Sequence, residues 1–88
     1  MRVTWTPTAK QEYDYWIQSD PKMVEAIQLL IKDIKRSQFE GLGKPEPLKY
    51  DLKGLWSRRI TREHRLVYRV SGKGPDKTLE IIQCRYHY

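Results

Sequence analysis

Three residues in the second half of the chain carry side chains that can move a proton or hold a phosphate. Glu46 lies between Pro45 and Pro47, Arg65 begins a segment of alternating polar and apolar residues, and His87 is the penultimate residue. Metal-free cleavage of RNA needs a base for the ribose 2′-hydroxyl, an acid for the departing 5′ oxygen, and a cation that stabilises the crowded phosphorane. A carboxylate, a histidine and an arginine suit these tasks, and the product would be a 2′,3′-cyclic phosphate.

The residues by themselves leave a structural explanation open for each of the three. Glu46 is held on a stiff backbone by its prolines, which suits a general base, but it can also be an exposed loop carboxylate that balances charge. Arg65 has a planar fork suited to phosphate and can equally pair with Glu63 or Asp51. His87 has the usual side chain for proton transfer near neutral pH, yet it lies where chain ends often fray.

Other polar and aromatic residues are weaker candidates. Tyr88 can stack on a base or help to hold a phosphate, and it can also simply pack on the surface. His64 lies in a predicted turn and is expected to be structural. Cys84 is expected to be a small buried hydrophobe rather than a nucleophile.

The positive charge of the chain is concentrated in its middle. Residues 1–43 carry six basic and six acidic residues, whereas residues 44–69 carry eight basic and three acidic ones, which is +5 of the net charge of +6. Such a distribution favours a polyanionic partner, with nucleic acid the first candidate. A solvated basic face without a ligand is the alternative.

Length and composition exclude several classes of protein. The 88 residues are expected to form one domain over 1–88. One cysteine forms no intrachain disulfide, and with two histidines it is too few for a zinc site without carboxylates, so no metal and no cofactor are expected. We see no apolar stretch of membrane-spanning length and no signal peptide, so we expect no membrane partner and a cytoplasmic location.

Two helix-start signals precede a strand-rich second half. Thr6-Pro7 and Asp20-Pro21 each combine an N-cap with a proline at the first helical position. Periodicity predicts a buried stripe on the first helix formed by Ala9, Tyr13, Trp16 and Ile17. The second helix, over about 21–36, is expected to bury Val24, Ile27, Leu30, Ile31 and Ile34. A short first strand holds Val3 and Trp5, and further strands are expected at 55–60, 65–70 and 78–86, with an irregular loop over 37–49 and a hairpin tip over 71–77.

This order of elements predicts an α+β fold, with two N-terminal helices packed on one face of a mostly antiparallel sheet of about four strands. In the last strand, Ile82, Cys84 and Tyr86 are expected to share one face. The sheet face away from the helices can remain open to solvent. It is expected to gather basic residues, namely Arg59, Arg65, Arg69, Arg85 and His87.

The segment GKPEPLKYDLKGLWSRRITREHRLVYRV, followed by CRYHY, resembles the YoeB family of toxins in the wider RelE-like group of messenger-RNA interferases. The resemblance implies a reduced microbial ribonuclease fold and a toxin–antitoxin system. Such toxins enter the ribosomal A site, cut the messenger there, and are blocked by a YefM-like antitoxin. The resemblance further implies a homodimer, and binding of operator DNA only by the toxin–antitoxin complex.

The same resemblance assigns roles to individual residues. It implies that Glu46 is the general base, Arg65 the phosphate-stabilising arginine, His87 the general acid and Tyr88 the terminal tyrosine of the site. Together with the charge pattern, it gives a set of expected RNA-binding residues: Lys44, Lys49, Arg59, Arg69 and Arg85. Two features depart from the family pattern, since Tyr50 stands where histidine is expected and the tip over 71–77 is longer.

Two other functions use the same basic surface. A non-catalytic module can stall translation by occupying the ribosome, and it needs no acid–base pair. A DNA-binding autoregulator is a further possibility, but no recognition-helix pattern supports it for this chain alone. For the antitoxin we expect an acidic, disordered segment that covers the basic face and folds on binding.

Overall fold

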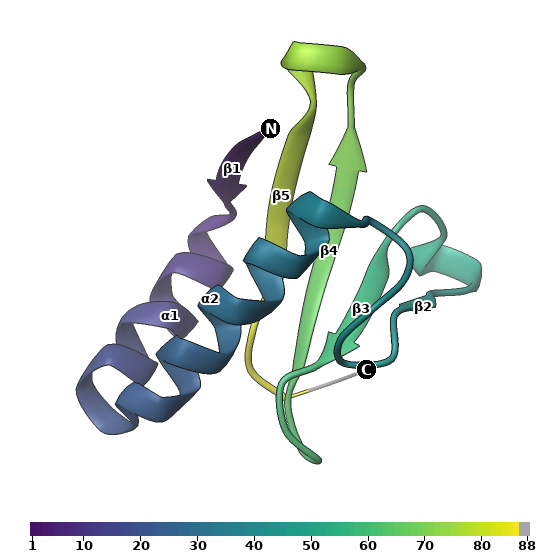
Figure 1. Cartoon of the computed structure of the whole chain (residues 1–88). Helices are drawn as coiled ribbons and strands as arrows, with labels where there is room; N and C mark the ends of the chain where they lie inside the picture. The colour runs from purple at the N-terminus through teal and green to yellow at the C-terminus, as the bar shows by residue number, and fades with distance from the viewer. Residues whose placement is uncertain (87–88) are drawn as a thin grey trace.

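The computed structural model describes residues 1–86 and places two helices against one face of a five-stranded sheet (Figure 1). The helices are α1 (Pro7–Ser19) and α2 (Pro21–Arg36). The strands are β1 (Arg2–Trp5), β2 (Glu46–Pro47), β3 (Trp56–Arg59), β4 (Arg65–Ser71) and β5 (Thr78–Gln83). Their order across the sheet is β1-β5-β4-β3-β2, with β1 parallel to β5 and the other pairs antiparallel. The predicted α+β fold is confirmed, with one strand more than expected.

Both helices begin at the predicted positions. The side chain of Thr6 accepts a hydrogen bond from the backbone N–H of Ala9 at 3.1 Å, and Asp20 accepts one from Lys22 at 3.2 Å. In each helix a proline follows the cap. These side chains satisfy N–H groups that have no partner inside the helix, so they fix where each helix starts.

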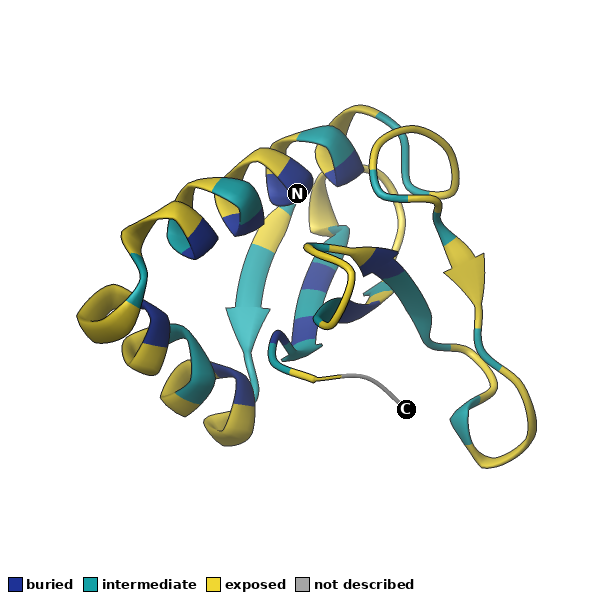
Figure 2. Ribbon diagram, turned by 90° about the horizontal axis from the view of Figure 1, so that it is seen from below, coloured by how far each residue is buried: buried dark blue, intermediate teal, exposed yellow. Residues whose placement is uncertain are grey.

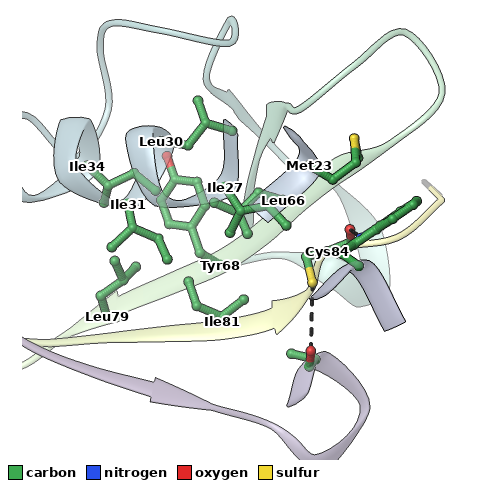
Figure 3. Close-up of a cluster of buried hydrophobic side chains, with 12 residues drawn as sticks. Met23, Ile27, Leu30, Ile31, Ile34, Leu66, Tyr68, Leu79, Ile81 and Cys84 are labelled. Atoms are coloured by element: carbon green, nitrogen blue, oxygen red, sulfur yellow. Dashed lines mark hydrogen bonds between the residues drawn. The ribbon is translucent and has the colours of Figure 1, made fainter. Parts of the chain in front are cut away.

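The core lies between the helices and the inner face of β4 and β5. Figure 3 shows side chains of α2 packed over those of the strands, with the Tyr68 ring among them. The buried set comprises Ala9, Trp16, Met23, Ile27, Leu30, Ile31, Ile34, Leu66, Tyr68, Leu79, Ile81 and Cys84. Burial raises the pKa of the Cys84 thiol to about 12, and its Sγ lies 3.7 Å from the carbonyl of Ala9 (Figure 3). Cys84 is therefore the buried hydrophobe that was expected.

The prediction that Ile17 belongs to the buried stripe of α1 is wrong. Ile17 is 48% exposed, whereas Ala9 and Trp16 are buried. At about 100° per residue, Ile17 lies about 80° from Ala9 around the helix axis, so it falls at the edge of the apolar stripe. Figure 2 shows the buried positions of both helices turned toward the sheet. Within residues 1–86, neither helix is long and apolar enough to cross a membrane.

The additional strand, β2, lies inside the segment expected to be irregular. Glu46 pairs with Ser57 and Pro47 with Trp56. The strand forms the edge of the sheet and is exposed along its length (Figure 2). Proline is tolerated at a sheet edge because its missing N–H is not needed there. Two residues are too few to show a periodicity, which is why the sequence pattern did not predict this strand.

The last strand is shorter than expected and contains a bulge. Tyr68 pairs with Ile81 and Val67 with Gln83, so Ile82 has no residue opposite it. An extra residue in one strand reverses the alternation beyond it. The inward positions are therefore Leu79, Ile81 and Cys84, whereas Ile82 is only partly buried and Tyr86 is 58% exposed. The prediction that Ile82, Cys84 and Tyr86 share an inward face is wrong except for Cys84.

Candidate functional site

The sheet face turned away from the helices brings Glu46 and Arg65 together. Glu46 lies opposite Ser57 and Ser57 lies opposite Val67, so these three side chains share one face. Arg59 and Arg65 are directly opposite each other, two residues further along β3 and β4 on that same face. Two strand spacings, about 10 Å, separate β2 from β4, and the offset of two residues along the strands adds about 7 Å. The backbones of Glu46 and Arg65 are therefore about 12 Å apart, a gap that the two side chains can span toward one phosphate.

Arg59 and Arg65 form a pair of like charges across two neighbouring strands. Like charges directly opposite each other in a sheet are destabilising. An anion bound between the two guanidinium groups would remove that cost, and a phosphate fits the planar fork of arginine. The pair is therefore suited to holding a phosphodiester beside Glu46.

The guanidinium of Arg65 is oriented by its own turn. Its Nη1 donates to the carbonyl oxygens of Thr61, Arg62 and His64 at 3.0, 3.1 and 3.2 Å. The alternative expected from the sequence, an ion pair with Glu63 or Asp51, is not present within residues 1–86. Nη1 thus anchors the side chain, and a fixed cation stabilises developing charge without reorganising.

Glu46 is presented on the exposed edge strand. On one side of it, Arg59 N donates to Gly43 O at 2.6 Å, and on the other Leu48 N donates to Leu55 O at 2.9 Å. Gly43 has φ +78°, and a Cβ there would lie 2.8 Å from the carbonyl oxygen of Arg59. A glycine is required at this position for the chain to lie so close to β3. The backbone around Glu46 is therefore fixed while its carboxylate stays exposed.

A buried arginine that the sequence pattern did not single out holds the loop before Glu46. Arg58 is completely buried, and its Nη2 donates to Ser37 O at 2.6 Å and to Glu40 O at 2.9 Å. Its Nη1 donates to Leu42 O at 3.1 Å and to Asp33 Oδ2 at 2.6 Å. One side chain thus ties three carbonyls of the loop to α2.

The carboxylate of Asp33 completes this network. It accepts from Leu42 N at 2.9 Å, from Arg36 Nε at 3.0 Å and from Arg58. These hydrogen bonds, that of Leu42 first, lower the pKa of Asp33 from 3.8 to about 2. The Tyr68 hydroxyl accepts from Arg58 Nε at 3.2 Å, and burial raises its pKa. No sequence signal separated Arg58 from the other basic residues, because its partners are mainly backbone carbonyls.

The chain after β5 is held beside Arg65. Trp16 Nε1 donates to Cys84 O at 2.9 Å, and Cys84 N donates to the Glu12 carboxylate at 2.8 Å. Two residues later, Arg65 N donates to Tyr86 O at 2.9 Å. His87 and Tyr88 lie outside the described residues, so their expected roles stay predictions. The described chain nevertheless reaches β4 at the residue before His87.

The remaining predicted RNA-binding residues lie in different surroundings. Lys44 and Lys49 are exposed and flank Glu46. Arg69 is on the open face and forms an ion pair with Glu80 across the strands at 2.6 Å. The prediction that Arg85 shares this face is wrong, because β5 ends at Gln83. The guanidinium carbon of Arg85 instead lies 3.8 Å from the centre of the Tyr15 ring, against α1.

Backbone strain gathers around the same site. Within residues 1–86, the non-glycine residues with positive φ are Lys44 (52°), Tyr50 (58°) and Tyr86 (61°). Lys44 precedes the β2 segment, Tyr50 follows it, and Tyr86 precedes His87. Left-handed conformations of such residues are costly and are found preferentially at functional sites. Their distribution points to the surface formed by β2, β4 and the end of the chain.

Comparison with known proteins shows which family the chain is similar to. The sequence model of the YoeB-like toxins of bacterial type II toxin–antitoxin systems matches residues 5–88. The chain is 52% identical to the toxin YoeB of Escherichia coli (strain K12) over 88 residues, which is the full length of both. A solved YoeB/ParE toxin from Agrobacterium tumefaciens has a TM-score of 0.96 and 57% identity, with both chains fully covered.

Assemblies of a third relative have also been solved. A YoeB dimer and a heterotetrameric YoeB–YefM toxin–antitoxin complex are known from Staphylococcus aureus. Both are 47% identical to this chain and cover 100% of it and 98% of the relative, with TM-scores of 0.90 and 0.89. The match of the family model and of these relatives over essentially the whole length establishes that the chain belongs to the YoeB-like toxins of bacterial type II toxin–antitoxin systems.

Proposed function

We propose that this chain is a ribosome-dependent endoribonuclease that cleaves messenger RNA in the A site and thereby inhibits translation. The observation that carries the proposal is the Arg59–Arg65 pair beside Glu46 on the sheet face turned away from the helices. That face supplies a carboxylate next to a place for a phosphate, which is the arrangement that RNA cleavage needs. Membership of the YoeB-like toxins supports the same activity.

The reaction follows from the groups around the phosphate. Glu46 takes the proton of the ribose 2′-hydroxyl, and the 2′ oxygen attacks the adjacent phosphorus. Arg65, with Arg59, stabilises the charge of the phosphorane. The bond to the 5′ oxygen breaks, and His87 donates a proton to that oxygen. The products are a 2′,3′-cyclic phosphate and a free 5′-hydroxyl, and the scheme uses no metal. We assign Tyr88 to the same site, where it contacts the phosphate or an adjacent base.

Dependence on the ribosome is consistent with the exposure of Glu46 on an edge strand. Lys44, Lys49 and Arg59 are all exposed around it and provide a basic surface rather than an enclosed groove. A surface of this kind binds the RNA backbone electrostatically but does little to align one phosphodiester. We infer that the ribosome supplies that alignment by fixing the messenger in the A site.

We further propose that the toxin forms a homodimer and binds a YefM-like antitoxin, as its Staphylococcus aureus relative does. The open face, with Arg59 and Arg65 opposite each other, suits an acidic segment of the antitoxin that folds as it binds. Binding of operator DNA is assigned only to the toxin–antitoxin complex. An antitoxin complex in which Arg65 remained exposed to solvent would contradict the proposed binding mode.

The variant Glu46→Gln tests the catalytic proposal. Removing a general base is expected to lower kcat by about 100-fold or more while ribosome binding is unchanged. Cleavage of a messenger programmed into the A site is followed by mapping the new RNA ends and by identifying the terminal phosphate. Glu25→Gln, an exposed residue of α2 with the same charge change, is the matched control.

The same measurement separates cleavage from stalling by occupancy. Discrete breaks at codons with the wild-type protein, lost in Glu46→Gln and in His87→Ala, support the enzyme. Translation that stops without new messenger ends would show that the toxin acts by occupying the ribosome. Full cleavage by both variants would contradict the roles assigned to these two residues.

A further inference from the structure

We infer that His64 is a positioning residue for the end of the chain, acting through a hydrogen bond that its ring accepts from the Tyr86 backbone. The inference rests on the proposed function, because it concerns the segment that carries His87. It assigns to His64 a task for which its position in a turn gave no indication. The task is to fix the path of the chain immediately before the proposed general acid.

Both backbone groups of Tyr86 are held by two consecutive residues. Tyr86 N donates to His64 Nδ1 at 2.8 Å, and Arg65 N donates to Tyr86 O at 2.9 Å. Tyr86 has φ +61°, a conformation that a tyrosine adopts only where its surroundings impose it. The two hydrogen bonds therefore hold the backbone of Tyr86, the residue before His87, in a shape that it would not keep alone.

The His64 ring is itself fixed in place. It packs edge-on against Trp16, with ring centroids 4.9 Å apart and an interplanar angle of 76°. The turn beneath it is also constrained, since His64 N donates to Thr61 Oγ1 at 3.2 Å and His64 O accepts from Ile60 N at 2.9 Å. The imidazole is thus a rigid acceptor held between α1 and the end of the chain.

The hydrogen bond from Tyr86 defines which tautomer the neutral His64 ring adopts. A backbone N–H can only donate, so Nδ1 must carry a lone pair. The neutral imidazole then has its proton on Nε2. A phenylalanine at position 64 would keep the ring against Trp16 but could not accept from Tyr86. An asparagine would lose the ring but place its Oδ1 close to the position of Nδ1.

The contact is separate from the fold itself. His64 is half-buried and does not belong to the core cluster. The chain is anchored two residues earlier by Trp16 and Glu12, which both bond to Cys84. Loss of the His64 acceptor would therefore leave β5 and the core in place and release only the chain from about residue 85. A misplaced general acid lowers the rate of the chemical step, whereas ribosome binding through the basic surface is retained.

Kinetics of two complementary variants test the inference. His64→Phe is expected to lower kcat for A-site cleavage by about 10- to 100-fold, with KM for programmed ribosomes and the melting temperature nearly unchanged. His64→Asn is expected to restore most of the kcat, because it provides an acceptor. A wild-type kcat in His64→Phe would overturn the assignment. So would a loss of kcat in His64→Asn as large as that in His64→Phe.

A measurement on the wild-type protein requires no cleavage and no variant. Nuclear magnetic resonance is expected to show His64 as the Nε2–H tautomer and the Tyr86 amide protected from hydrogen exchange. A protonated Nδ1 or an unprotected Tyr86 amide would overturn the inference, even if a variant failed to fold. If both signatures are present but the wild-type protein cleaves no messenger, the proposed function fails and the structural contact stands.

Discussion

At the scale of single residues, Arg58 and Asp33 hold the loop that leads to Glu46. Arg58 is fully buried and hydrogen-bonds to three loop carbonyls, to Asp33 and to Tyr68. A buried cation is tolerated only when it is paired and its donors are satisfied. Arg58 therefore holds much of the loop over residues 37–43, together with the Asp33–Leu42 and Arg59–Gly43 hydrogen bonds, and that loop leads directly to Lys44 and Glu46.

The lowered pKa of Asp33 predicts sensitivity to acid. An unfolded aspartate titrates near 4, whereas Asp33 in the folded protein titrates at about 2, so folding favours its ionised form. Its contribution to stability is complete above about pH 5 and declines as the pH falls toward 2. We expect Asp33→Asn to be less stable than the wild type at pH 7 and to lose less stability between pH 5 and pH 2.

Urea unfolding at several pH values measures this effect. Asp14→Asn is a suitable control, because Asp14 pairs with Lys10 on the exposed surface of α1. The control should keep the acid dependence of the wild type. If the stability of Asp33→Asn depends on pH in the same way as that of the wild type, Asp33 is not the source of the acid sensitivity.

At the scale of elements, the β3–β4 hairpin contains two arginines whose like charges repel each other. Arg59 and Arg65 lie opposite each other, and Arg59 is exposed. We expect Arg59→Gln to raise the free energy of unfolding by about 0.5 kcal/mol, because it removes the like-charge contact. The same variant should weaken RNA binding and reduce its dependence on salt.

Chemical denaturation and salt-dependent RNA binding check the two halves of this prediction. Arg62→Gln, in the turn between the strands, provides the matched charge change away from the pair. If Arg59→Gln is more stable than the wild type but binds RNA equally well, the Arg59–Arg65 pair does not hold RNA. A loss of stability in Arg59→Gln would contradict the repulsion itself.

The elements also show which parts of the structure can be predicted from the sequence. Helix starts at Thr6 and Asp20 are local signals, and alternation correctly placed Arg59 and Arg65 on one face. The bulge at Ile82 depends on how β5 pairs with β4, so no pattern within 78–86 revealed it. Arg85 was assigned to the wrong surface for a different reason, because β5 ends at Gln83, before this residue.

The residues of the candidate site show the same difference between local sequence signals and contacts that depend on the fold. Glu46 and Arg65 were chosen as candidates because their residue types suggest chemistry, and the resemblance to toxins gave them predicted roles. Arg58 was not singled out, and His64 was expected only to be structural, because their partners are mainly backbone groups that are distant in the sequence. Side chains that hold the backbone carry no signature in residue type alone.

At the scale of the whole molecule, the two ends of the chain are joined in the sheet. β1 pairs only with β5, from Arg2 opposite Thr78 to Trp5 opposite Ile81. β5 lies between β1 and β4 and contributes Leu79 and Ile81 to the core. The last described strand is therefore an interior strand of the sheet with partners on both sides, so the fold is incomplete without it.

Two truncations test this dependence. A chain that ends at residue 77 lacks β5 and is expected to be unfolded, whereas a chain that ends at residue 86 is expected to keep the fold and lose cleavage, since it lacks His87 and Tyr88. Dispersion of amide resonances and the A-site cleavage assay provide the two measurements. A folded protein ending at residue 77, or full cleavage by the one ending at residue 86, would contradict the prediction.

The pairing of β1 with β5 also has a consequence for timing. Residues 2–5 are synthesised long before residues 78–81, which are their only partners in the sheet. Contacts of such long sequence separation form late in folding. A growing chain thus cannot complete its sheet until β5 has been made. The proposed activity on the ribosome requires the complete fold and His87, so it is absent from any chain that has not yet been synthesised beyond β5.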